Sequence, residues 1–145
     1  MNLEMFPFYE DLDKYALEFL KIHLQPIYVP KDTILFSQDD ICDSILFLTS
    51  GEIALSMKSD AEEEIFLYRL KAGEQCIVNT ASTLSQTKAV ATATTLSDIE
   101  GYIIDMYSIK ELIANCRPYQ EFIFSLYRVH MGSLVKINSK NNNQE

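Results

Sequence analysis

Residues 30–55, PKDTILFSQDDICDSILFLTSGEIAL, decide the fold of this chain. Residues 33–36 and 44–49 are short apolar runs rich in strand-forming side chains, and residues 53–55 begin a third run. Polar turns separate the runs, and the side chains of residues 37–40 favour local hydrogen bonds over a continued strand. The pattern predicts short antiparallel strands joined by turns.

The alternation of short runs and turns continues on both sides of this stretch. Residues 59–63 form a polar hairpin turn, and residues 79–86, rich in small polar side chains, are expected to be a loop with at most one helical turn. Strands of this length and spacing predict a mainly β fold with flanking helices, a double-stranded β-helix or jelly roll. Further strands are expected at residues 27–29, 53–58, 64–70, 88–94 and 99–104, with a short segment at residues 75–78.

Helical periodicity marks the two ends of the chain. Apolar residues recur at helical spacing over residues 8–24, which predicts an N-terminal helix that ends before Pro26. Near the other end, Ser108 and Glu111 make a capping-box pattern for a helix over residues 109–115.

A longer helix is expected to follow. Pro118 suits its first turn, and the helical pattern continues to at least Lys136. Residues 138–145, NSKNNNQE, carry no apolar side chain and are expected to be a flexible tail. The chain has 145 residues, so we expect residues 1–137 to form one domain with a single core.

This longer helix carries two apolar stripes. Because a helix packed on a small domain needs one apolar face, two faces predict that one packs on the domain and the other meets a partner. The alternative is a single broad stripe that faces the core. One stripe has coiled-coil spacing and is the candidate dimer interface, while the second stripe lies beside it. The first comprises Ile123, Tyr127, His130, Leu134 and Ile137, and the second comprises Phe122, Leu126 and Val129.

The charge of the chain excludes one class of partner. The chain has 21 acidic and 12 basic residues, which gives a net charge of −9. A surface of that sign repels phosphate backbones, and the arginines Arg69, Arg117 and Arg128 form no cluster. We therefore expect that this chain does not itself bind DNA or RNA.

Cysteine usage and hydropathy indicate an intracellular chain. Cys42, Cys76 and Cys116 are widely spaced and make no metal-binding pattern, so reduced, mostly buried thiols are expected. No apolar run is long enough to span a membrane, and the N-terminus lacks the regions of a signal peptide. We expect a cytoplasmic location and no membrane partner.

The pattern of residues 30–55 resembles the start of the β-roll in Crp/Fnr regulators and other cyclic nucleotide-binding domains. The resemblance rests on a Pro-Lys opening with Leu-Phe after it, an acidic turn, and a Gly-x-Ile turn before the next strand. It implies an effector pocket inside the roll, dimerisation through residues 118–137, and a DNA-binding winged helix that this chain lacks. We expect an effector-sensing, dimerising regulatory domain of a bacterial transcription regulator. The matching positions are residues 30–31, 35–36, 39–40, 43–47 and 51–53.

The segment that binds cyclic nucleotides in that family departs from its pattern here. The family pattern has an Arg-(Ser/Thr)-Ala sequence whose arginine contacts the cyclic phosphate, whereas this chain reads Thr87-Lys88-Ala89. Residues 73–84 are similar to a different Crp/Fnr pattern, found in members that are not general cyclic nucleotide receptors. We therefore expect that the chain is not a standard cyclic nucleotide receptor. A receptor for cyclic AMP or cyclic GMP remains the alternative.

A polar patch falls where the family's ligand pocket lies. Its hydroxyl, carboxylate and ammonium groups suit a small anion or polar ligand, and the alternative is an ordinary solvated loop. The sequence identifies no effector, and we expect no obligatory cofactor. The candidate ligand-binding residues are Glu74, Thr80, Ser82, Thr87 and Lys88.

Two further classes of function would need other residues. A haem-based gas or redox sensor would use His23 or His130 as an axial ligand, although a histidine on an apolar stripe more often packs at an interface. Cupin-type enzymes share the jelly roll but need a His-x-His pair and a glutamate for their metal. With two histidines far apart, that site cannot be built, so we expect neither a metal site nor an enzyme.

Overall fold

Short strands build two antiparallel sheets. The computed structural model describes residues 3–142, and their side chains as far as Val129. One sheet has the order β1-β7-β3 and the other β2-β6-β4-β5. Within this part of the chain the strands are β1 (Gln25–Val29), β2 (Ile34–Phe36), β3 (Ser44–Ser50), β4 (Glu52–Lys58), β5 (Glu64–Lys71), β6 (Thr92–Thr95) and β7 (Ile99–Asp105).

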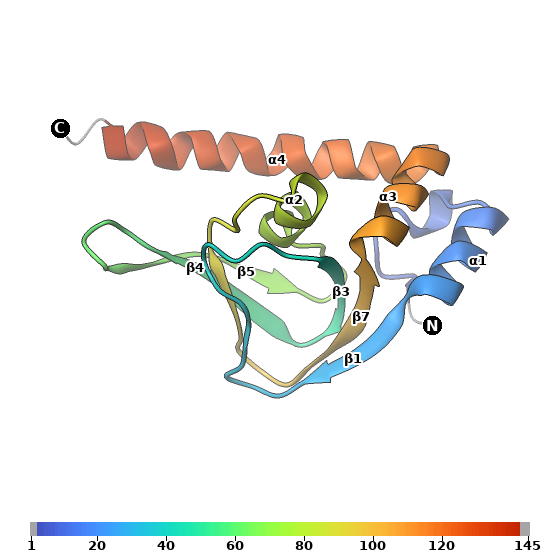
Figure 1. Ribbon diagram of the computed structural model, residues 1–145, viewed down its shortest axis with the longest axis horizontal. Helices are drawn as coiled ribbons and strands as arrows, with labels where there is room; N and C mark the ends of the chain where they lie inside the picture. Colours follow the sequence, from blue (N-terminus) through green and yellow to red (C-terminus); the bar gives the residue numbers. More distant parts are fainter. Residues whose placement is uncertain (1–2, 143–145) are drawn as a thin grey trace.

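The two sheets face each other and enclose a core, which confirms the predicted jelly roll. β3 is buried on both sides: Leu48 is fully buried in the core between the sheets, while Ile45 and Phe47 are fully buried against residues of the helices. Strands distant in sequence pair directly. For example, β1 lies beside β7, with Gln25 opposite Ile103. Figure 1 shows the sheets curving toward each other, with the β4–β5 hairpin extending from one end.

Helices cover one side and one end of this roll. Figure 1 shows α4 lying over the roll with α2 beneath it, and α1 and α3 gathered at the N-terminal end. None of the helices in the described part of the chain is long and apolar enough to cross a membrane. The helices are η1 (Tyr9–Asp11), α1 (Lys14–His23), α2 (Ile77–Ser85), α3 (Met106–Asn115) and α4 (Arg117–Asn142).

Capping side chains shift two of the predicted helix starts. The single helix expected over residues 8–24 is wrong, because Asp13 begins α1 by accepting a hydrogen bond from the Ala16 amide at 2.8 Å. The capping box at Ser108 is also wrong. Asp105 is the N-cap of α3, and Ser108 lies inside that helix and donates its hydroxyl proton to the Asp105 carboxylate.

The loop expected over residues 79–86 is instead the helix α2. Its serine and threonine side chains find partners in other elements, so they do not compete for the helix backbone. The Ser82 hydroxyl accepts from the Cys42 amide at 2.9 Å, and the Thr83 hydroxyl donates to the Ser44 carbonyl at 3.0 Å. Gln86 ends the helix in a left-handed conformation.

Pro118 lies in the first turn of α4, as predicted. The helix extends to Asn142 and so includes the first residues of the tail expected at residues 138–145. Residues 143–145 lie outside the described part of the chain.

The core consists of two clusters. The helical-end cluster joins the N-terminal segment, α1, α3 and the start of α4 to β3 through aromatic rings such as Phe8, Phe47 and Tyr119. The roll cluster lies between the sheets and under α2, and it combines leucine and isoleucine with the small residues Ala91 and Ala93.

A tight turn at Gly51 joins β3 to β4. Its φ of +94° is a conformation that side chains rarely adopt. A Cβ atom there would also lie 2.5 Å from the Asp98 carbonyl oxygen, so both the dihedral and the space require glycine.

Candidate functional site

A cavity of about 210 Å³ lies inside the roll, between the two sheets and beneath α2. The family resemblance places an effector pocket in this interior, so the cavity is the candidate site. Most of the lining side chains are apolar and come from strands far apart in sequence. The lining residues are Ile27, Leu35, Phe36, Ser44, Leu46, Ile53, Leu70, Cys76, Asn79, Ala93 and Ile103.

Most polar groups of this lining already form hydrogen bonds with other groups of the protein. The Asn79 amide accepts from the Leu46 backbone N–H at 3.0 Å and donates to the Ser44 carbonyl at 2.8 Å. The Cys76 thiol lies 3.4 Å from the Tyr68 hydroxyl. Burial raises the pKa of the Cys76 thiol, so this sulfur stays protonated and neutral. The lining therefore presents little charge to a ligand.

All three cysteines are buried and unpaired, as predicted. Burial also raises the pKa of the Tyr68 hydroxyl, which keeps both members of the Tyr68–Cys76 contact neutral.

Two of the predicted ligand-binding residues lie inside the fold. Thr80 is fully buried, and its hydroxyl accepts from the Gln75 side-chain amide at 3.0 Å. Ser82 is also buried and joins two segments, since its hydroxyl accepts from Cys42 and donates to the Thr87 carbonyl at 2.7 Å. These hydroxyl groups hold α2 against its neighbours.

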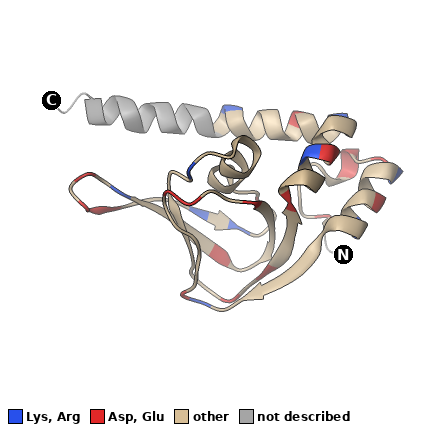
Figure 2. Ribbon diagram, viewed as in Figure 1, with Lys and Arg blue, Asp and Glu red and all other residues tan. Residues whose placement is uncertain are grey.

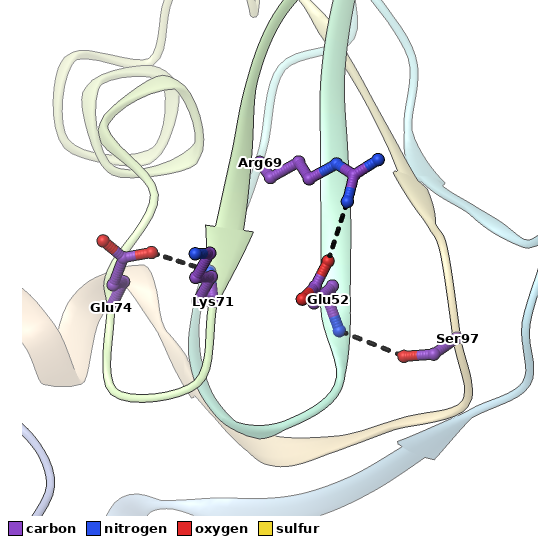
Figure 3. Close-up of polar contacts among 5 residues, drawn as sticks. All are labelled: Glu52, Arg69, Lys71, Glu74 and Ser97. Carbon is purple, nitrogen blue, oxygen red and sulfur yellow. Dashed lines mark hydrogen bonds and ion pairs between the residues drawn. The ribbon is translucent and has the colours of Figure 1, made fainter.

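The other three predicted ligand-binding residues are exposed. Glu74, Thr87 and Lys88 all lie on the surface, and none of them lines the cavity. Figure 3 shows Glu74 turned back on its own turn, where its carboxylate accepts from the Lys71 backbone amide at 2.7 Å. The structure thus does not bring the five predicted residues together around one ligand.

The roll interior does not fit a cyclic phosphate. Among the described residues, those that line the cavity include no lysine or arginine. Arg69, the arginine nearest in sequence to the start of α2, is directed toward Glu52 on the neighbouring strand, 3.5 Å away (Figure 3). Figure 2 shows that lysine and arginine are scattered over the described ribbon. A phosphate in this cavity would lose water without gaining a cation.

A buried chain of hydrogen bonds, not expected from the sequence, joins α4 to α2. The Tyr119 hydroxyl donates to the Gln75 side-chain oxygen at 3.0 Å, and the Gln75 amide nitrogen donates to Thr80 at 3.0 Å. Burial raises the pKa of Tyr119, which therefore remains a neutral donor. A second contact joins Ser85 of α2 to the Tyr127 hydroxyl. Isolated Gln, Thr and Tyr residues carry no local pattern that would have revealed this chain.

The predicted dimer stripe on α4 faces the protein's own core where its side chains are described. Ile123 is only 8% exposed and belongs to the helical-end cluster, and Tyr127 is half-buried. The side chains of His130, Leu134 and Ile137 lie outside the described residues. The neighbouring stripe lines a groove of about 430 Å³ between α4 and the N-terminal segment. Its lining residues are Pro7, Phe8, Asp11, Pro118, Glu121, Phe122, Ser125, Leu126 and Val129.

His23, Ser108 and Asp105 lie together, but their order does not suit nucleophilic catalysis. The Ser108 hydroxyl donates to the Asp105 carboxylate at 2.6 Å and lies 3.2 Å from His23 Nδ1. The imidazole therefore cannot take the serine proton, which is already held by the carboxylate.

His23, a candidate axial ligand for haem, does not line the cavity. Its ring stacks on Phe19 with centroids 4.2 Å apart, and it lies outside both the roll cavity and the α4 groove. His130, the other candidate haem ligand, lies outside the residues whose side chains are described. Within those residues, no three His, Cys, Asp or Glu side chains are grouped to hold a metal ion.

Comparisons with known proteins agree on the fold. The family model of the cyclic nucleotide-binding domain matches residues 26–116, well over half of the chain. None of the curated protein sequences matches this chain significantly.

Solved structures with the same fold carry different functions. The Thermus thermophilus catabolite activator protein has a TM-score of 0.77 at 19% identity, covering 93% of this chain and 63% of that one. A putative Crp/Fnr-family transcriptional regulator from Eubacterium rectale has a TM-score of 0.76 at 22% identity, covering 94% and 63%.

The regulatory subunit of a cAMP-independent protein kinase A from Trypanosoma brucei has a TM-score of 0.77 at 12% identity, covering 91% and 48%. The chain thus spans less than two thirds of each of these three proteins. At these identities the likeness establishes the fold and leaves the ligand open.

Proposed function

Because this chain belongs to the cyclic nucleotide-binding domain family, we propose that it is the effector-sensing, dimerising domain of a cytoplasmic Crp/Fnr-like bacterial transcription regulator. We further propose that its effector is not a cyclic nucleotide. DNA binding would then belong to a winged-helix domain outside this chain, which agrees with the net charge of −9.

The buried chain from Tyr119 through Gln75 to Thr80 is the observation that carries this proposal. Gln75 adjoins Cys76, which lines the cavity, while Tyr119 lies in the first turns of α4. A ligand that moves α2 must either carry Tyr119 with it or break a buried hydrogen bond. This connection between the neighbourhood of the cavity and the helix proposed to form the dimer supports the proposal.

Dimerisation is proposed through α4 and a second copy of this chain. Apolar residues remain exposed on this helix, since Phe124 is 73% and Val129 is 67% exposed. The groove lined by Phe122, Leu126 and Val129 belongs to the same helix, and its volume of about 430 Å³ leaves room for side chains of another helix. Because Ile123 is buried in its own chain, we assign the contact to this neighbouring stripe.

Self-association tests the dimer. Sedimentation velocity over a range of concentrations should give a dimer for the native chain. Val129→Asp places a charge on the exposed stripe and should weaken self-association by at least about tenfold. Tyr107→Asp is the matched control, because Tyr107 is 78% exposed on α3, away from the groove. A strictly monomeric native chain at high concentration would refute the dimer.

Cyclic nucleotide binding is tested separately. The family match is the observation that favours a cyclic AMP or cyclic GMP receptor as the second candidate function. Calorimetry and thermal unfolding with millimolar cyclic AMP and cyclic GMP should show no binding and no stabilisation. A clear rise in unfolding temperature with either nucleotide would establish the receptor and refute the proposed absence of a cyclic nucleotide effector.

A further inference from the structure

We infer that the roll cavity binds a small, uncharged and mainly apolar molecule, about the size of a substituted benzene ring. The inference rests on the proposed sensing function and specifies the chemistry of its effector. It follows from the volume of the cavity, the polarity of its lining and the charge at its edge.

The volume limits the size of the ligand. An apolar cavity of about 150 Å³ accommodates benzene, so a cavity of about 210 Å³ has room for one ring with a short substituent. A small side chain on an inner strand leaves part of this space. Ala93 of β6 is buried and borders the cavity, and it lies opposite the buried Leu55 of β4.

The lining limits the polarity of the ligand. Eight of the eleven lining residues are apolar. The side-chain amide of Asn79 is already hydrogen-bonded to the β3 backbone. The Ser44 hydroxyl makes no hydrogen bond with any described residue, although it borders the cavity. A ligand with one hydroxyl group therefore finds one partner, while an ionised ligand would be buried without a counter-charge.

The edge of the cavity disfavours anions further. A second hollow, of about 320 Å³, shares Leu35, Phe36, Ser44 and Asn79 with the cavity and so adjoins it. Its remaining lining includes the exposed carboxylates of Asp40 and Asp43. A carboxylate or phosphate that enters by this route would meet like charge, whereas a neutral molecule would not.

Three probes of similar size separate these requirements. Benzyl alcohol carries the ring and one hydroxyl, toluene lacks the hydroxyl, and benzoate carries a charge. Titration followed by two-dimensional NMR of the full chain should show saturable shifts around the cavity with benzyl alcohol and toluene, with toluene the weaker. Benzoate should bind at least about tenfold more weakly than benzyl alcohol, because its charge would be buried unpaired.

A matched pair of variants locates the site. Ala93→Leu fills the cavity and should weaken binding of benzyl alcohol by at least about tenfold. Ala54→Leu adds the same side chain on the outer face of the same sheet, since Ala54 lies between the buried Ile53 and Leu55, and it should leave binding unchanged. If Ala93→Leu does not fold, Ser44→Ala serves in its place. It should weaken benzyl alcohol binding about threefold and leave toluene unaffected, as loss of one hydrogen bond predicts.

The outcomes separate this inference from the proposed function. Binding of benzoate as tight as that of benzyl alcohol, equal effects of Ala93→Leu and Ala54→Leu, or no binding of any probe would each overturn the inference. A dimeric native chain that binds none of the probes would refute the cavity ligand alone. A monomeric chain that binds benzyl alcohol in the cavity would support the ligand class and refute dimeric sensing.

Discussion

The two ends of the core are filled in different ways. At the helical end, Phe6, Phe8, Phe47 and Tyr119 contact one another with ring centroids between 5.2 and 6.5 Å apart. In the roll, branched aliphatic residues pack with small alanines, and a cavity of about 210 Å³ remains between the sheets. One end is therefore filled by interlocking rings, and the other keeps internal space.

This difference suits the two ends to different roles, one to hold α4 in place and the other to admit a ligand. Tightly packed side chains resist displacement, so the helical end holds the start of α4 at a fixed place on the roll. Internal space lets nearby side chains shift at lower cost, so the roll is where a ligand can enter. Gln75, just before α2, joins the two regions, because its side chain contacts both Tyr119 of α4 and Thr80 of α2.

The same substitution at each end should test this division most strongly. Phe47→Ala removes a fully buried ring from the helical end and should lower the free energy of unfolding by about 3–5 kcal/mol. Phe36→Ala removes a half-buried ring that already borders the cavity, and should cost about 1–2 kcal/mol. Urea denaturation followed by circular dichroism measures both. Equal losses would show that the two ends are packed alike.

Breaking the connection between the ends should have the next largest effect. Tyr119→Phe leaves the buried Gln75 oxygen without its donor and should cost about 1–3 kcal/mol. Gln75→Leu should cost a similar amount, because it removes the partner of both Tyr119 and Thr80. The double variant should cost less than the sum of the single ones by at least about 0.5 kcal/mol. Strict additivity in urea denaturation would mean that the chain does not act as a unit.

The helical end should also lose stability in acid. The Ser108 hydroxyl, through its hydrogen bond, lowers the pKa of the Asp105 carboxyl in the folded state. This contribution is present above the ordinary carboxyl pKa of 3.8 and is lost as the pH falls through the lower folded value. Ser108→Ala should therefore reduce the fall in urea midpoint between pH 7 and pH 3, whereas Ser50→Ala, on an exposed strand end, should not. An unchanged pH dependence in Ser108→Ala would remove Ser108 as the cause.

The smallest effect is expected at the surface of the roll. Arg69→Ala breaks an exposed ion pair with Glu52 and should change the free energy of unfolding by at most about 1 kcal/mol. It should also leave the binding of benzyl alcohol unchanged, because Arg69 does not line the cavity. Loss of ligand binding in Arg69→Ala, measured by the same NMR titration, would place the site outside the roll.

The sequence predicted the parts of the fold that local patterns control. The strand expected at residues 44–49 appears as β3 with one more residue, because a short apolar run bounded by polar turns is visible in the sequence itself. α2 was missed because its Ser and Thr residues favour loops in isolation. Their hydroxyl groups are satisfied only by distant partners, such as Ser82 by Cys42 and Thr83 by Ser44.

The candidate site was less predictable than the fold. Its lining runs from Ile27 to Ile103, so no short segment contains it. The polar patch in the sequence drew attention to Thr80 and Ser82, whose hydroxyl groups turned out to hold the fold together. The lack of an arginine at the position of Lys88 was more informative about the ligand. It shows from the sequence alone that the usual phosphate-binding side chain is missing.

The pairing of β1 with β7 has a consequence for synthesis of the chain on the ribosome. Gln25 lies opposite Ile103, so β1 must wait for most of the domain to emerge before it can pair. At about 5–20 residues per second, that wait lasts about 4–15 seconds. During this time β1 and β2 present unpaired backbone, since β2 also waits for its partner β6. The roll therefore closes late in synthesis, and a nascent chain stalled before residue 92 would have neither sheet complete.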